Sequence, residues 1–128
     1  MGISYLLDSN TVIQYVGNKF PSSVLSKIDS IIDEELLISV ITVIEVLGFN
    51  GEPDEMNTLK SFTNMATVIS LADEIVDETI SIRKQYKIKI PDAIIAATAI
   101  KLNATLITSN ISDFLIIKGI TLIDPSQL

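Results

Sequence analysis

The sequence predicts an α/β fold: a three-layer α/β/α domain with a central, mainly parallel sheet. Short apolar segments alternate with helical segments along the chain, and parallel neighbouring strands need helical crossovers of this kind. The chain has 128 residues, and 48% of them are hydrophobic, which suits a single domain with its own core. We therefore expect one domain over residues 1–128.

Five short apolar segments are the expected strands, and they lie at residues 3–7, 36–40, 67–70, 105–108 and 120–123. Polar or charged residues interrupt every apolar stretch before the roughly 18 residues that a membrane-spanning helix needs. The N-terminus also lacks the basic region of a signal peptide. We therefore expect a soluble, cytoplasmic protein.

Capping residues and helical periodicity place the expected helices between these strands. Pro21 opens an amphipathic helix that reaches the acidic run at 33–35. Pro91 opens an alanine-rich helix through residue 102, whose small side chains permit close approach to a sheet. A helix over residues 42–47 is expected to be buried, because Glu45 is its only charged residue. Further helices are expected at 11–16, 55–64 and 72–86, and a polar turn with a short helical piece at 109–114.

Composition removes several classes of chemistry. The chain contains no cysteine and no histidine, so disulfides, thiolate metal sites, cysteine nucleophiles, Ser-His-Asp triads and histidine bases are excluded. Lysine and arginine number 9 against 16 aspartates and glutamates, a net charge of −7, which argues against broad, nonspecific binding to nucleic acid or anionic lipid. Hydrolytic chemistry would depend on carboxylates, lysine or metals bound through oxygen.

Four carboxylates are expected to meet at one edge of the sheet. Ligands of parallel α/β folds bind beyond the carboxyl ends of the strands, and the acids placed near those ends are Asp8, Glu45, Asp92 and Asp113. The negative charges in such a cluster repel one another. The cluster normally persists only because a hard cation neutralises it. A set of oxygen ligands favours Mg²⁺ or Mn²⁺.

Each acid also has a purely structural interpretation. Asp8 suits an N-cap, Asp92 a helix-dipole partner and Asp113 a turn, whereas Glu45 lies in an apolar helix without a basic neighbour and so needs a partner. Nearby polar side chains could orient carboxylates or bound water: Asn10, Thr108 and Asn110. For Ser9 and Thr42 we favour capping and turn formation.

Four sequence blocks resemble the motifs of PIN-domain ribonucleases, most closely the VapC-type toxins of prokaryotic toxin–antitoxin pairs. They read LLDSNT at 6–11, SVITVIE at 39–45, PDAIIAATA at 91–99 and TLITSNISDF at 105–114. The resemblance implies a PIN-like fold and a Mg²⁺-dependent (or Mn²⁺-dependent) endoribonuclease whose metal is held by the matching acids, Asp8, Glu45, Asp92 and Asp113. It also implies a homodimer that a small antitoxin inhibits.

The chain departs from the family pattern at three positions. Ser9 stands where threonine is usual, Ser109 where arginine or another residue is often found, and Asn110 where many members have an acid. The fourth ligand is therefore Asp113, Asn110 or a water held between them.

The expected RNA contacts are basic residues that precede Asp92. Four of the 9 basic residues fall within seven positions, and they are Arg83, Lys84, Lys87 and Lys89. They suit phosphates that flank a cleavage site, although they equally suit compensation of a helix dipole.

Two rival functions remain. A haloacid-dehalogenase-like phosphatase would need an acid where Asn10 stands, and a binding module of the same fold would hold metal or a basic peptide without catalysis.

Overall fold

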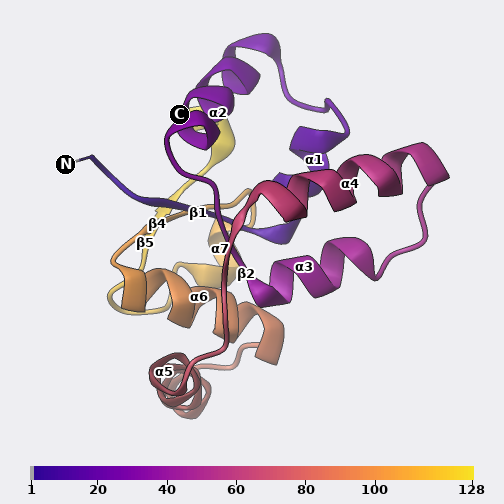
Figure 1. Ribbon diagram of the computed structural model, residues 1–128. Helices are drawn as coiled ribbons and strands as arrows, with labels where there is room; N and C mark the ends of the chain where they lie inside the picture. Colours follow the sequence, from indigo (N-terminus) through magenta and orange to yellow (C-terminus); the bar gives the residue numbers. More distant parts are fainter. Residues whose placement is uncertain (1) are drawn as a thin grey trace.

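The computed structural model describes residues 2–128 and contains a five-stranded, entirely parallel sheet in the order β3-β2-β1-β4-β5 (Figure 1). The expected α/β/α fold is therefore confirmed. The strands are short, and each lies within a segment that the sequence predicted: β1 Tyr5–Leu7, β2 Leu37–Ser39, β3 Thr67–Ile69, β4 Thr105–Ile107 and β5 Thr121–Ile123.

Seven α-helices connect the strands in the described part of the chain, and their starts follow local chemistry. Asp8 caps α1, Ser39 caps α3, and prolines stand in the first turns of α4 and α6. Helix α6 ends at Asn103, which adopts the left-handed conformation (φ 53°) common just beyond a helix. The helices are α1 Ser9–Val16, α2 Ser22–Glu34, α3 Val40–Leu47, α4 Pro53–Met65, α5 Asp73–Gln85, α6 Ile90–Leu102 and α7 Ile111–Phe114, and a 3₁₀ turn, η1, covers Pro125–Gln127.

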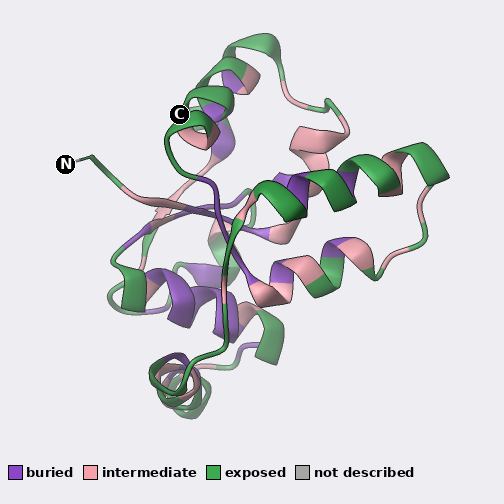
Figure 2. Ribbon diagram, in the orientation of Figure 1, coloured by how far each residue is buried: buried purple, intermediate pink, exposed green. Residues whose placement is uncertain are grey.

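Alternation along the strands divides the core between the two faces of the sheet. Leu6 packs with side chains of α5, α6 and α7, whereas the next residue, Leu7, packs with those of α1, α2 and α4. The same alternation separates Leu106 from Ile107, as expected for successive side chains of a strand. Figure 2 shows how thoroughly α6 is buried, and its residues 93–99 are buried without a break.

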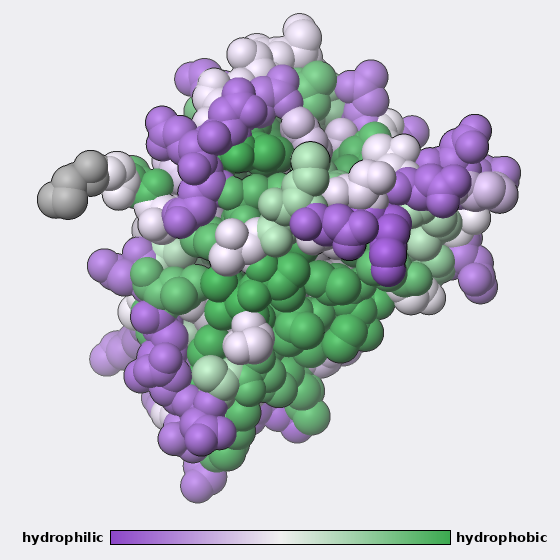
Figure 3. Space-filling view, viewed as in Figure 1, coloured by the Kyte–Doolittle hydropathy of each residue, from purple (hydrophilic) through white to green (hydrophobic). Residues whose placement is uncertain are grey.

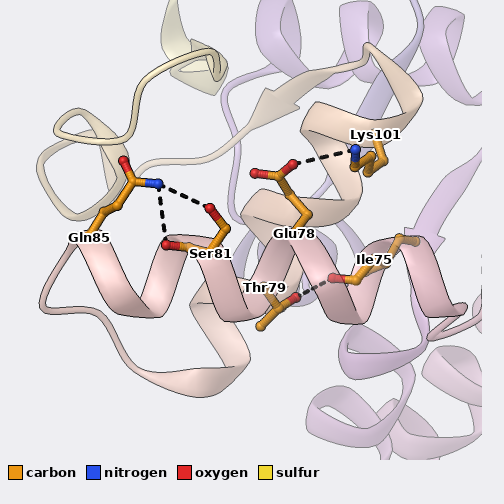
Figure 4. A network of polar contacts seen from close by, with 6 residues as sticks. All are labelled: Ile75, Glu78, Thr79, Ser81, Gln85 and Lys101. Atoms are coloured by element: carbon orange, nitrogen blue, oxygen red, sulfur yellow. Dashed lines mark hydrogen bonds and ion pairs between the residues drawn. The ribbon is translucent and has the colours of Figure 1, made fainter.

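Helices α5 and α6 pack closely together (Figure 4). Lys101 of α6 forms an ion pair with Glu78 of α5 at 3.5 Å. Within α5, the Thr79 hydroxyl donates to the Ile75 carbonyl at 2.7 Å, and the Gln85 amide donates to Ser81. Because the ion pair is partly exposed, apolar packing supplies most of the stability of this contact.

The order of the strands produces a crevice at the carboxyl edge of the sheet. After β1 the chain continues into α1 on one face, and after the neighbouring β4 it continues into α7, whose Phe114 packs on the other face. Neighbouring strands whose connections leave to opposite faces open a binding crevice between them.

One helix differs from the expectation. Helix α3 was expected to be buried, but Ile44 is 62% exposed and Glu45 is also exposed. Only Thr42 and Val46 of this helix are buried, because α3 lies on the outside of the domain and presents one face inward.

No helix within residues 2–128 has the length and apolar character needed to cross a bilayer.

Candidate active site

A pocket of about 80 Å³ lies at the crevice, and its lining joins residues far apart in sequence. Three of the four predicted acids line it. The full lining is Asp8, Ser9, Asn10, Glu45, Asp92, Ile95, Asn110 and Phe114. None of these side chains is basic, so the pocket concentrates negative charge.

Asp8 is fixed in place by the start of α1. Its Oδ1 accepts the Thr11 N–H at 2.8 Å, and the residue is only 4% exposed, so its predicted role as an N-cap is confirmed. Burial raises the pKa of this carboxyl, and the charge of Glu45 adds to the rise. Hydrogen bonding with Thr108 and Thr11 acts in the opposite direction. Asp8 is therefore a rigid, partly desolvated carboxylate at the floor of the pocket.

Glu45 reaches the pocket from α3, and its partner is a hydroxyl. Ser9 Oγ lies 2.6 Å from Glu45 Oε1 and 3.2 Å from the hydroxyl of Thr42. The sequence indicated that Glu45 needs a partner, but the capping role favoured for Ser9 and Thr42 is wrong. Helix α1 is capped by Asp8 and α3 by Ser39.

Asp92 enters from the first turn of α6 and is half-buried. Burial raises the pKa of its carboxyl, and the charges of Glu45, Asp113 and Asp8 raise it further, while Lys89 lowers it. The other three predicted acids therefore all act on Asp92, although the four come from separate segments of the chain.

Asp113 and Asn110 take different places around Asp92. Asn110 lines the same pocket as Asp8 and Glu45. Asp113 is exposed in α7 and lines an adjoining pocket of about 270 Å³ together with Asp92, Lys87, Ile88 and Lys89. Thr108 is fully buried, and its hydroxyl accepts the Asn110 N–H at 3.0 Å. Thr108 thereby holds the turn that carries Asn110.

The four predicted basic residues separate into two groups. Lys87 and Lys89 line the pocket that adjoins Asp92. Arg83 donates from its guanidinium to the Ile88 carbonyl, so it supports the loop that carries these lysines. Lys84 lies exposed in the last turn of α5.

The donors of the pocket fit a hard divalent cation in their chemistry. Carboxylates, hydroxyls and the amides of Asn10 and Asn110 supply only oxygen ligands. The raised pKa values of Asp8 and Asp92 reflect the cost of desolvated, mutually repelling charges, which a cation would relieve. Among residues 2–128 no three acidic groups are already gathered tightly enough to enclose an ion, so the side chains would have to close around it.

Comparison with known proteins agrees with this fold. A family model described as the PIN domain matches residues 5–117. No curated protein sequence is detectably similar to the chain.

Solved structures share the fold over nearly the whole chain. VapBC2 from Rickettsia felis, bound to a DNA fragment from its promoter, is 25% identical with a TM-score of 0.78, and the match covers 94% of this chain and 97% of that one. A toxin–antitoxin complex from Klebsiella pneumoniae is 26% identical with a TM-score of 0.76, covering 98% and 100%. VapBC-1 from nontypeable Haemophilus influenzae is 25% identical with a TM-score of 0.76, covering 95% and 98%.

Proposed function

Because the chain belongs to the PIN domain family, we propose that it is a metal-dependent endoribonuclease and the toxin of a type II toxin–antitoxin pair. The observation that carries the catalytic part is the shared pocket of Asp8, Glu45 and Asp92. The similarity to VapBC and toxin–antitoxin complexes supports the toxin part. The phosphatase is disfavoured because Asn10 cannot act as the general acid that its chemistry needs, whereas the binding module is separated from the nuclease by the cleavage experiment below.

Asp8 and Asp92 are the proposed direct ligands of Mg²⁺ or Mn²⁺, and Glu45 binds directly or through water. Asp113 or Asn110 completes the set. The chemistry that a bound ion supplies is activation of water and stabilisation of the charge that develops on the phosphate. The resemblance to the family implies products with 5′-phosphate and 3′-hydroxyl ends.

The protein's own groups orient the reactants. Asp8 is held by the Thr11 N–H, so its carboxylate keeps a fixed orientation in the lining of the pocket. Asn10 and Asn110 provide amide groups at the rim, where they can hold a water or a ribose hydroxyl by hydrogen bonds. Ile95 and Phe114 form the apolar wall, which limits access of bulk water and strengthens the electrostatic interactions inside.

RNA would approach across the adjoining pocket of Lys87 and Lys89. These lysines can contact phosphates beside the scissile bond and thereby offset the repulsion between RNA and a chain of net charge −7. Arg83 contributes by supporting the loop, and Lys84 extends the basic surface along α5. The acidic pocket itself excludes phosphate until a cation is bound.

The proposed protein partner is a small antitoxin with a basic segment that enters the acidic pocket. Charge complementarity supports this, because all the charged side chains that line the pocket are carboxylates. An antitoxin bound there would block both the ion and the RNA. A homodimer is the second proposed assembly.

The surface offers a place for a second copy of the chain. Figure 3 shows a broad hydrophobic area over the edge strand β3 and the neighbouring α3. Ile44 of α3, Val68 of β3 and Leu71, which follows β3, are exposed. Large apolar patches and open strand edges favour association.

The experiment that tests the catalytic proposal is cleavage of structured RNAs by purified protein with Mg²⁺ or Mn²⁺, beside the Asp92→Asn variant. The proposal predicts cleavage by the wild-type protein that requires the metal, and a loss of at least about a hundredfold in the variant. Metal binding without any RNA cleavage would instead favour the binding module.

A further inference from the structure

A chain of three polar side chains crosses from α1 to α3 beside the pocket. Ser9 Oγ lies 2.6 Å from Glu45 Oε1 and 3.2 Å from Thr42 Oγ1. Ser9 lies 33 positions from Thr42 and 36 from Glu45, so these contacts depend on the tertiary fold. Thr42 is fully buried, Ser9 is half-buried and Glu45 is exposed. The contacts therefore link the protein interior to a long, exposed carboxylate side chain of the site.

Counting protons fixes the direction of these hydrogen bonds. A serine hydroxyl has one proton to donate and can accept through its lone pairs, whereas an ionised carboxylate only accepts. The short contact to Glu45 therefore takes the Ser9 proton. The Thr42 hydroxyl then donates to Ser9, and the direction runs from Thr42 through Ser9 to Glu45.

Neither hydroxyl serves its own helix. Thr79 and Thr98 are buried helical threonines, and each donates to the carbonyl four residues earlier at 2.7 Å. Thr42 bonds across to Ser9 instead. The caps of α1 and α3 are supplied by Asp8 and Ser39, so local helix formation does not account for the Ser9 and Thr42 contacts.

We propose that Ser9, supported by Thr42, is a positioning residue that holds the Glu45 carboxylate at the pocket for cation binding. This inference rests on the proposed function. A glutamate on an exposed helix face loses side-chain freedom when it binds an ion. Because one oxygen of Glu45 is already held by Ser9, that loss is partly incurred before the ion arrives, and the other oxygen remains free.

The test compares Mn²⁺ affinity, measured by calorimetry on metal-free protein, among substituted proteins. Ser9→Ala should weaken Mn²⁺ binding by roughly tenfold to a hundredfold, the usual effect of removing a group that orients a ligand. Ser9→Thr keeps the hydroxyl and should stay within about twofold of the wild type. Thr42→Val should weaken binding by a smaller factor. Ser30→Ala and Thr98→Val, which remove helical hydroxyls away from the pocket, should leave affinity unchanged.

A double substitution shows whether Ser9 acts through Glu45. In a Glu45→Gln background, Ser9→Ala should cost much less Mn²⁺ affinity than it does in the wild type. Equal losses in both backgrounds, or wild-type affinity in Ser9→Ala, would overturn the inference. Failure of the proposed function would look different, because the wild type would then cleave RNA no faster than Asp92→Asn, while the Mn²⁺ affinities would still decide the role of Ser9.

Discussion

Lys89 and Asp92 lie within one helical turn at the start of α6, and their side chains line the same pocket. Lys89 also lowers the pKa of the Asp92 carboxyl, against the larger effects of burial and of the other acids. One turn of helix therefore carries both a proposed metal ligand and a proposed contact for RNA phosphate. If the proposed function holds, this arrangement gives a strongly acidic protein a local site for a polyanion.

Replacing Lys87 or Lys89 by alanine should weaken RNA binding while the protein stays folded. Lys87→Ala and Lys89→Ala should each make RNA binding less dependent on salt, because the slope of log affinity against log salt falls by about 0.7 to 1 for every phosphate that a lysine ceases to neutralise. Fluorescence anisotropy in a Glu45→Gln background, which prevents cleavage, measures this. Lys60→Ala, on exposed α4, is the control, and equal effects of all three changes would argue against a site at Lys87 and Lys89.

The crowded carboxylates should reduce stability at neutral pH. The pKa of Asp92 is raised above its ordinary value of 3.8 in the folded protein. The folded state therefore holds this proton more tightly than the unfolded state, and stability falls as pH rises through the raised pKa. Without divalent metal, Asp92→Asn should melt at a higher temperature than the wild type at neutral pH, and the difference should vanish at a pH below the ordinary pKa. Thermal unfolding over this pH range is the measurement, with exposed Asp77→Asn as control.

Divalent metal should reverse that order. An ion that binds only the folded protein, present at about a hundred times its dissociation constant, adds about 2.7 kcal/mol, which corresponds to a rise in melting temperature of about 10 °C for a domain of this size. The rise should occur in the wild type and be largely absent in Asp92→Asn. Equal rises in both proteins would place the ion elsewhere.

The sequence predicted the scaffold well because local signals and global topology agree. Strands such as residues 105–108 are apolar segments between polar turns, and the prolines expected to open helices, Pro21 and Pro91, stand at the starts of α2 and α6. The alanine-rich helix was expected to approach the sheet, and α6 is the most continuously buried helix described. The same positional reasoning predicted that the acids gather at one edge.

The contacts of the site were less predictable, because they depend on tertiary distances. Ser9 and Thr42 look like ordinary capping residues in sequence, and only the fold brings them beside Glu45. A signal was nevertheless present: Asp8 already supplied a cap for α1, which left Ser9 without that role. Asp113 could not be separated from Asn110, because a short helix at α7 decides which side chain faces which pocket.

The proposed homodimer can be tested at the edge strand. Leu71→Asp places a charge in the hydrophobic area beside Val68, where burial against a second copy would be costly. Sedimentation equilibrium should show a dimer for the wild type and a shift toward monomer for the variant. Leu115→Asp, a matched change at an exposed leucine after α7, should leave the dimer intact, and equal behaviour of the two variants would locate the interface elsewhere.

The hydrogen bond between Tyr15 of α1 and Asp29 of α2 should stabilise the folded protein without affecting RNA cleavage. The Tyr15 hydroxyl donates to Asp29, and burial together with this bond raises the pKa of Tyr15 to about 12. Tyr15→Phe removes the bond but keeps the ring contact with Phe62, so it should cost about 1 kcal/mol of unfolding free energy. Denaturant unfolding measures the loss. RNA cleavage should be unchanged. A decrease would mean that α1 couples this contact to Asp8.

Asp8, Glu45 and Asp92 are proposed to act together on one divalent ion to cleave RNA. The decisive experiment follows the cleavage rate of a structured RNA as Mn²⁺ is titrated, for the wild type and for Asp8→Asn, Glu45→Gln and Asp92→Asn. We expect metal-dependent cleavage in the wild type and a loss of at least about a hundredfold in each variant. Cleavage that proceeds without metal, or that survives all three substitutions, would rule out a shared metal site as the source of activity.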